Sequence, residues 1–294
     1  MKEFRDRVAV VTGAASGIGR ALAGRFAAEG MRCVLADVDS DALDRAVGEL
    51  RRDGADAIGV RTDVASAADV QALADATVSA FGAVHLLCNN AGVGIGTDFA
   101  NIPLDVWEWV LGVDLWGVIH GCRTFLPLLL QQEEGHIVNT SSMAALNGHP
   151  LGLAPYTVSK FGVLGLSQNL FFELAATTSG RVGVSVLMPG LTRTRIFESI
   201  RNMPATVTTP PPSSFQRSSM AAIEGVWDNA MPPDKVADVV TSAIREQRFY
   251  ILPHPDEAFD MAEQQLRWMR ANVPLVPGPG VARTADTQIT GGLA

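Results

Sequence analysis

Tyr156 and Lys160 are the two residues of this chain whose types and spacing most clearly suggest chemistry. Tyr156 is one of two tyrosines, and Lys160 is one of three lysines in a chain that otherwise carries its positive charge on arginine. The surrounding segment, APYTVSKFGVLGLSQNLFFEL, has apolar residues at helical spacing, and residues four apart lie on one face of a helix. An ammonium beside a phenol favours the phenolate, so the pair predicts a general acid and base for an alcohol or a ketone. The alternative is an ordinary surface pair.

A glycine-rich turn supplies a second pattern, suited to phosphate. Gly13 follows a predicted strand over 7–12, and Gly17 and Gly19 open a predicted helix over 17–29, with the spacing Gly-x-x-x-Gly-x-Gly. Glycine lets the backbone approach a ligand, and the free N–H groups and dipole of a helix start favour an anion. The turn therefore predicts a site for the pyrophosphate of a dinucleotide, although the glycines could also serve turn geometry alone.

Asp37 ends the second predicted strand. A carboxylate there can accept hydrogen bonds from the ribose hydroxyls of adenosine, and it repels a 2′-phosphate. NAD is therefore predicted in preference to NADP, although Arg20 could contact a 2′-phosphate. The alternative role is a helix N-cap, because Asp37, Asp39 and Ser40 all precede the next predicted helix.

The elements that must position these residues follow from short apolar runs that alternate with longer amphipathic ones. The predicted strands cover 7–12, 33–37, 57–63, 84–89, 136–141, 182–189 and 249–253. The predicted helices cover 17–29, 40–53, 66–81, 103–132, 155–178 and 233–246. Continuous Val, Ile and Leu runs indicate strands buried on both faces. The pattern predicts one α/β domain over 1–271, a Rossmann-type, doubly wound parallel sheet of about seven strands with helices on both faces.

Two segments break this alternation. Residues 195–231 include the stretch MPATVTTPPPSSFQ, and a loop of this length inside a compact domain predicts a substrate lid. Residues 272–294 have weak periodicity and no core face, which predicts a loose C-terminal tail unless a partner subunit orders it.

Composition excludes several classes of partner. The net charge of −8 and the absence of a basic run argue against nucleic acid. No apolar run approaches the roughly 18 residues that span a bilayer, and the N-terminus enters a strand without a signal peptide. Cys33, Cys88 and Cys122 lie in apolar stretches, as buried thiols of a reducing compartment do. We therefore expect a cytoplasmic protein without a membrane partner, and the histidine spacing predicts no metal.

Four motifs in order resemble the short-chain dehydrogenase/reductase family. They are TGAASGIG at 12–19, NNAG at 89–92, Ser142 with YTVSK at 156–160, and PGLTRT at 189–194. The resemblance implies an NAD(H)-dependent oxidoreductase that interconverts a secondary alcohol and a ketone by hydride transfer. The alternatives are a catalytically idle NAD(H)-sensing or scaffolding protein on the same fold, and an epimerase or dehydratase of the wider superfamily.

The resemblance also implies a role for each matching residue. Tyr156 is the acid and base, Lys160 assists it and holds the nicotinamide ribose, and Ser142 binds the substrate oxygen, with Ser141 as the alternative. Ser142 and Tyr156 are 14 residues apart, one more than expected, which predicts an insertion beside the pocket. The implied cofactor contacts are Gly13, Ser16, Gly17, Ile18, Gly19, Asp37, Asp63, Val64, Asn90, Ala91, Gly92, Tyr156, Lys160, Pro189, Gly190, Thr192 and Thr194.

Asp114 departs from the family pattern. The family usually has an asparagine in the long fourth helix as part of a proton relay, whereas this chain reads LGVDLWGVIHG. An aspartate keeps the backbone carbonyl of the relay, loses the amide donors and adds negative charge. Asp114 stays a candidate catalytic residue, and the alternative is a buried helix acid satisfied by nearby backbone.

The expected substrate is a small-molecule alcohol or ketone with a bulky apolar body, of the aryl, alicyclic or steroid-like kind. The pocket candidates are His149, Met188, Ile196, Phe197 and Trp227, for which plain packing is the alternative. A homodimer or homotetramer is implied because related enzymes use the fourth helix and the Tyr156 helix as subunit interfaces. The aromatic residues there are Trp107, Trp109, Trp116, Phe125, Phe161, Phe171 and Phe172, which could also bury against the sheet.

Overall fold

The computed structural model describes residues 1–147, 152–212, 217, 221, 225 and 227–271. The pocket candidate His149, part of the predicted lid and the predicted tail over 272–294 lie outside these described residues.

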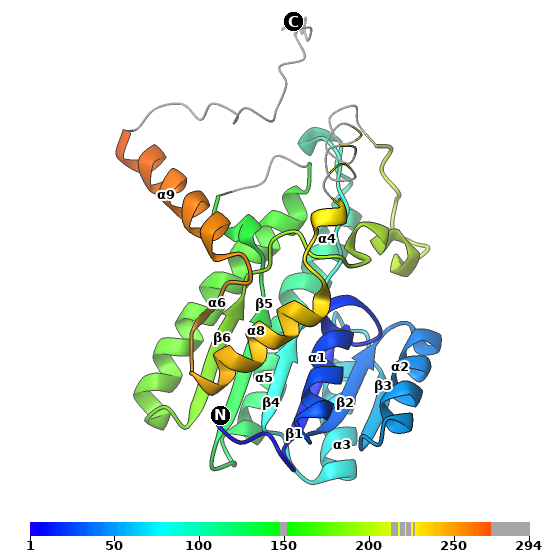
Figure 1. Cartoon of the computed structure of the whole chain (residues 1–294). Coiled ribbons are helices and arrows are strands. Elements are labelled where there is room, and N and C mark those ends of the chain that lie inside the picture. Colours follow the sequence, from blue (N-terminus) through cyan, green and yellow to red (C-terminus); the bar gives the residue numbers. More distant parts are fainter. Residues whose placement is uncertain (148–151, 213–216, 218–220, 222–224, 226, 272–294) are drawn as a thin grey trace, which may run out of the picture.

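A seven-stranded parallel sheet forms the centre of the described molecule (Figure 1). Its strand order is β3-β2-β1-β4-β5-β6-β7. The strands are β1 Val8–Thr12, β2 Arg32–Asp37, β3 Ala57–Arg61, β4 Leu86–Asn89, β5 Gly135–Thr140, β6 Val182–Leu187 and β7 Tyr250–Ile251. The predicted Rossmann-type sheet is confirmed, and the strand positions agree with the apolar runs to within about two residues.

Helices cover both faces of this sheet (Figure 1). The helices are α1 Gly17–Ala28, α2 Ser40–Arg52, α3 Ala67–Phe81, α4 Leu104–Leu111, α5 Gly117–Leu129, α6 Ala154–Thr178, α8 Pro233–Arg245 and α9 Pro255–Ala271. Helices α1, α2 and α8 share one buried apolar cluster, and α3, α5 and α6 share another. Along β1, Ala9 and Val11 face the first cluster while Val8 and Val10 face the second, because successive side chains of a strand point to opposite faces.

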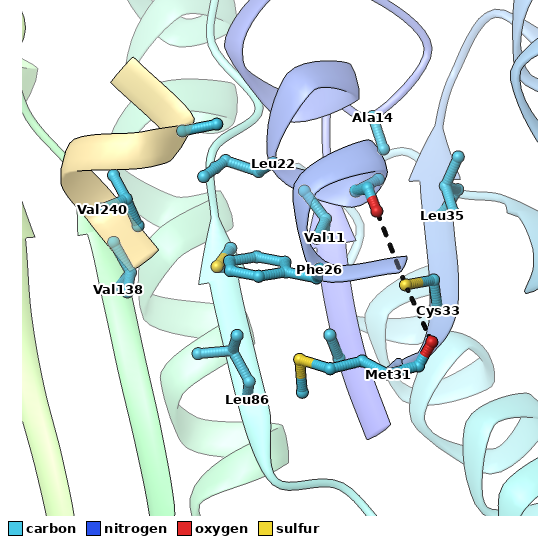
Figure 2. Packing of buried hydrophobic residues seen from close by; sticks show 14 of the residues in the cluster. Val11, Ala14, Leu22, Phe26, Met31, Cys33, Leu35, Leu86, Val138 and Val240 are labelled. Carbon is cyan, nitrogen blue, oxygen red and sulfur yellow. Dashed lines mark hydrogen bonds between the residues drawn. The ribbon is translucent and has the colours of Figure 1, made fainter. Parts of the chain in front are cut away.

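Figure 2 shows the packing on the α1 face. The ring of Phe26 is fully buried among side chains from several strands and from α8. Val11 of β1, Leu86 of β4, Val138 of β5 and Val240 of α8 all belong to this cluster. The cluster holds α1 against the sheet, and it thereby fixes the start of α1 beside the carboxyl end of β1.

One predicted helix is wrong in detail. The sequence predicts a continuous helix over 103–132, but a π-helical turn over Gly112–Trp116 separates α4 from α5. A π-turn inserts one extra residue into the helical ladder and changes the direction in which nearby side chains point. Asp114 lies within this turn and is completely buried.

The C-terminal helix α9 was not among the predicted helices. Its start carries the usual signals, with Pro255 at the first position and Asp256 and Glu257 in the first turn. Of its 17 residues, only Ala258 is fully buried, so the core-facing periodicity is weak and gave no clear signal. The helix extends away from the body of the sheet (Figure 1).

The aromatic residues on the two long helices divide between core and surface. Phe125 is fully buried in the sheet cluster, and the partly buried Phe171 packs on Phe249 with ring centres 4.8 Å apart. Trp116, Phe161 and Phe172 remain exposed. Burial against the sheet is therefore confirmed for Phe125, and a subunit interface at the exposed members stays a prediction.

None of the helices in the described part of the chain combines the length and the apolarity that a bilayer span needs. The same residues contain no group of three or more His, Cys, Asp or Glu side chains placed to hold a metal ion. All three cysteines are free and buried.

Candidate active site

A cavity of about 730 Å³ opens over the carboxyl ends of the strands. Gly13 and Asp37 line one end of it, and Tyr156 and Ile196 line another part. The strand order reverses direction at β1, because β2 lies on one side of it and β4 on the other. Open α/β sheets bind ligands at such a switch point, outside the carboxyl ends of the strands.

The glycine turn is packed too closely for larger residues. Gly13 has φ +65°, and a Cβ on it would lie 2.8 Å from the Ala91 Cα. A Cβ on Gly19 would overlap the Gly13 carbonyl oxygen. Gly19 therefore allows α1 to start directly against the turn, and it is not on the cavity wall. A direct contact between Gly19 and a cofactor stays a prediction, because Gly19 belongs to the first turn of α1.

The start of α1 suits a pyrophosphate. Ser16 stands at the N-cap, but its side chain does not cap the helix, and the first turn has no acidic side chain. Ser16, Gly17 and Ile18 all line the cavity. The backbone N–H groups of a first helical turn have no partner within the helix, and the helix dipole favours negative charge there. The residues present therefore fit a dinucleotide phosphate group.

The structure separates the two roles that were open for Asp37. Asp39 is the N-cap of α2, since its Oδ1 accepts the Ala42 N–H at 3.0 Å. Asp37 lies on the cavity wall, and its Oδ2 accepts the Ala15 N–H at 3.0 Å. This bond fixes the carboxylate beside the glycine turn, which is the position a ribose contact needs. Arg20, the alternative phosphate contact, pairs with Glu49 and is not on the wall.

The turn after β4 is tied to the glycine turn. The Thr12 hydroxyl accepts the N–H groups of Asn90 and Ala91 at 3.0 and 3.1 Å. The Asn90 amide donates to the Thr12 carbonyl at 3.0 Å. These bonds hold the NNAG turn and the glycine turn as one rigid rim of the cavity.

Tyr156 and Lys160 lie together on the face of α6 that borders the cavity. The Lys160 Nζ is 5.1 Å from the centre of the Tyr156 ring, and both residues line the wall. The pair is therefore not an ordinary surface pair, because Lys160 is almost completely buried. Their proximity is a direct consequence of the four-residue spacing on one helix.

Two adjacent serines after β5 have different surroundings. Both serines line the cavity, and the Ser142 Oγ accepts the Ala144 N–H at 3.1 Å. Ser141 is buried, and its hydroxyl donates to the Lys160 carbonyl at 2.7 Å. Ser141 therefore ties the end of β5 to α6, which leaves Ser142 as the better candidate for a contact with substrate.

Asp114 forms a buried ion pair with Lys160. The Asp114 Oδ2 lies 2.9 Å from the Lys160 Nζ, and the other oxygen accepts the Val93 N–H at 2.8 Å. Burial alone would lower the pKa of Lys160, but the charges of Asp114 and Tyr156 outweigh it and raise that pKa. Burial raises the pKa of the Asp114 carboxyl, and Lys160 opposes this rise. Lys160 therefore keeps its proton at neutral pH.

Most of the predicted site residues meet at one cavity. Every predicted cofactor residue except Gly19 lines the wall, as do Ser142, Ile196 and Phe197. Trp227 is not on the wall and packs against Phe197 with ring centres 5.9 Å apart. The expectation that Met188 lines the pocket is wrong, because Met188 is fully buried in a cluster with Ala145 and Val186.

Sequence reasoning missed several residues of the wall. Glu257 and Met261 come from α9, and Trp109 comes from α4. Arg61 ends β3 directly beside Asp37, and the two are register partners. The acidic first turn of α9 could have indicated this helix from the sequence. Nothing in the sequence indicated Arg61 as a wall residue, because only the pairing of β2 with β3 brings it beside Asp37.

The fold and the wall together define a dinucleotide-binding α/β protein with a tyrosine–lysine pair at its cavity. The family model described as short chain dehydrogenase matches residues 7–205. The chain therefore belongs to the short-chain dehydrogenase family, and the resemblance predicted from the four motifs is confirmed.

Individual relatives match along most of their length. The chain is 36% identical to a 1-deoxy-11-beta-hydroxypentalenate dehydrogenase of Streptomyces avermitilis, with 89% of each chain covered. It is 33% identical to a C alpha-dehydrogenase of Sphingobium sp. strain SYK-6, with 87% of this chain and 83% of that protein covered. A Burkholderia phymatum short chain dehydrogenase/reductase solved in complex with NAD has 42% identity and a TM-score of 0.89, with 94% of this chain and 99% of that chain covered.

Proposed function

We propose that this oxidoreductase interconverts a secondary alcohol and a ketone with NAD(H), and that Tyr156 is its acid and base. The observation that carries the proposal is the pairing of Tyr156 with a buried, charged Lys160 on the wall of the same cavity as the glycine turn. General acid–base catalysis requires a proton-transferring group in reach of the reacting oxygen, held in a defined charge environment.

NAD is favoured as the cofactor by the residues at the glycine-turn end. The start of α1 would hold the pyrophosphate, and the Asp37 carboxylate would accept hydrogen bonds from the adenosine ribose. Asp37 would repel the 2′-phosphate of NADP, and Arg20 is engaged by Glu49. The Burkholderia phymatum neighbour was solved with NAD, which agrees with this assignment.

The proposed mechanism assigns one task to each side chain. Bound NAD supplies a hydride acceptor, and NADH a hydride donor, at C4 of the nicotinamide ring. Ser142 orients the substrate by a hydrogen bond to its oxygen. Tyr156 removes the hydroxyl proton in alcohol oxidation and returns it to the oxygen in ketone reduction. Lys160 stabilises the phenolate electrostatically, and the rim at Pro189 and Gly190 would border the nicotinamide carboxamide.

The substrate end of the cavity favours a bulky apolar molecule. Its wall includes Trp109, Leu153, Ile196, Phe197 and Met261, which come from four separate segments. Apolar walls with a few convergent polar groups are typical of sites for small organic ligands. We infer an aryl, alicyclic or steroid-like alcohol or ketone, with Ile196 and Phe197 as part of a lid over it.

We also propose that two or more copies associate through α6. Val158, Phe161 and Phe172 are exposed on this helix at spacings that place them along one stripe, and Trp116 is exposed on the neighbouring π-helical turn. A contiguous exposed apolar patch is typical of an interaction site, and these side chains share one stripe of α6. A cytoplasmic location remains part of the proposal, and the three free, buried thiols agree with it.

The test is the variant Tyr156→Phe, assayed with a panel of secondary alcohols and ketones by the absorbance of reduced nicotinamide. We expect turnover to fall by about 10²–10⁴-fold, the usual contribution of a general acid or base, while NADH still binds. Tyr250→Phe is the matched control, because Tyr250 is the other tyrosine and lies on the surface at the end of the sheet. Full activity in Tyr156→Phe would refute the proposal, and an unmodified protein that binds NADH but turns over nothing in the panel would favour the idle sensor.

A further inference from the structure

A carboxylate lies directly against the ammonium that is proposed to assist Tyr156. The Asp114 and Lys160 side chains are 0% and 4% exposed, and 2.9 Å separates their charged atoms. The pair lies just behind the cavity rim, because a Cβ on Gly92 would be 3.5 Å from both the Asp114 Oδ2 and the Lys160 Nζ. Water therefore screens this interaction little.

The backbone holds this carboxylate in place from two sides. Asp114 lies in the π-helical turn Gly112–Trp116, which directs its side chain inward. The Val93 N–H, from the turn after β4, donates to its Oδ1 at 2.8 Å. Within the described residues, the Oδ2 has no partner other than the ammonium of Lys160. Asp114 is therefore fixed as the counter-charge of Lys160.

The other groups that face the pair are neutral. The Lys160 Nζ also contacts the Thr140 carbonyl of β5 at 3.4 Å and lies over the Tyr156 ring of α6. From the turn after β4, the Val93 N–H donates to Asp114, and the uncharged backbone of Gly92 lies beside both side chains. Among the titratable groups that act on Lys160, Asp114 and Tyr156 are the ones that matter. Among the residues that the structure describes, the ammonium beside the phenol is thus paired with one carboxylate.

We propose that Asp114 is a positioning residue that tunes the proton affinity of Tyr156 by holding and partly neutralising Lys160. This inference deepens the proposed function and rests on it. A carboxylate beside the ammonium weakens the positive field that the ammonium exerts on the phenol, so removal of this carboxylate should favour the phenolate. The protonated phenol is the form that ketone reduction requires.

The test is direct titration of Tyr156. Tyr250→Phe leaves Tyr156 as the single tyrosine of the chain, so the near-ultraviolet phenolate absorbance of the cofactor-free protein reports this group alone. In that background, Asp114→Asn removes the negative charge with almost no change in shape. We expect the midpoint of the phenol titration to move to lower pH by about one unit or more.

Glu108→Gln is the matched control. Glu108 lies on α4, is exposed, and loses the same unit of charge. We expect no shift of the titration midpoint in this variant. If Asp114→Asn folds poorly by circular dichroism, Asp114→Ser removes the same charge with a smaller side chain and should give a shift in the same direction.

A kinetic readout separates this role from simple structural support. In Asp114→Asn, the acid limb of the pH profile of kcat/KM for alcohol oxidation should move to lower pH by the same amount as the titration. Titrations and profiles that superimpose on those of the parent would overturn the inference for Asp114. Activity retained in Tyr156→Phe would instead refute the proposed function, so the two failures are distinguishable.

Discussion

Charge placed at single positions carries most of the chemistry of this site. Lys160 supplies the buried positive charge, Asp114 compensates it, and Asp37 supplies a negative charge at the far end of the cavity. A backbone N–H holds each of the two carboxylates, Val93 for Asp114 and Ala15 for Asp37, and Asp114 in turn holds Lys160. Fixed charges of this kind discriminate between ligands, because they do not need to be reoriented when a ligand binds.

The Asp37→Ala variant tests discrimination between the two cofactors. Removing the carboxylate removes the repulsion of a 2′-phosphate and leaves Arg61 next to the ribose position. We expect the ratio of kcat/KM for NAD to kcat/KM for NADP to fall by about tenfold or more, equivalent to about 1.4 kcal/mol. Steady-state kinetics with both cofactors measure the ratio.

The control for this prediction is Asp39→Ala. Asp39 caps α2 and does not line the cavity, so its loss should cost about 1 kcal/mol of stability and leave the cofactor preference unchanged. An unmodified enzyme that already favours NADP would show that the role assigned to Asp37 is wrong.

At the scale of elements, the site depends on how α5 and α6 approach β4 and β5. A buried polar network joins these elements: the Asn89 amide donates to the Asn139 Oδ1 at 2.8 Å, and the Asn139 amide donates to the Ser167 hydroxyl at 3.1 Å. Gly121 allows α5 to approach this network, because a Cβ there would overlap the Asn89 Oδ1. Buried polar groups must keep their partners, so the network fixes the spacing of these elements.

Gly121→Ala therefore tests the packing of α5. We expect the free energy of unfolding to fall by about 1–3 kcal/mol, because overpacking and lost hydrogen bonds outweigh the better helix propensity of alanine. Urea unfolding measures the change. Gly48→Ala on α2 is the control, since a Cβ at Gly48 would contact nothing within 4 Å, and it should be neutral or stabilising. Equal stability of the two variants would contradict the proposed role of Gly121.

For the molecule as a whole, the exposed stripe on α6 is the feature that a single copy leaves unexplained. Phe172 is 71% exposed, and Phe161 and Val158 continue the stripe along the helix. We expect the unmodified protein to sediment as a dimer or larger assembly, and Phe172→Asp to shift it toward the monomer, because an aspartate cannot be buried there without a partner. Analytical ultracentrifugation measures both species.

Val78→Asp is the matched control for this experiment. Val78 is exposed on α3, which is neither of the two helices that the resemblance implies as subunit interfaces. We expect it to leave the sedimentation unchanged. An unmodified protein that sediments as a monomer at micromolar concentration would contradict association through α6.

The local features of this protein follow from its sequence because their causes are local. Apolar periodicity sets each strand and helix, and the four-residue spacing of Tyr156 and Lys160 puts both on one face of α6. The order of strand and helix patterns leads to a parallel doubly wound sheet, since right-handed crossovers leave few other arrangements. Most of the cavity wall was predictable for the same reason, because the carboxyl ends of parallel strands meet at one edge.

Contacts between distant segments were decided only by the tertiary structure. The periodicity of residues 103–132 does not reveal the π-helical turn that brings Asp114 to Lys160. The sequence left the cap of α2 open among Asp37, Asp39 and Ser40, and hydrogen-bond geometry assigned it to Asp39. Met188 was indistinguishable from a pocket residue until the packing of the sheet buried it. These outcomes depend on which side chains meet across the fold, and a linear pattern does not contain that information.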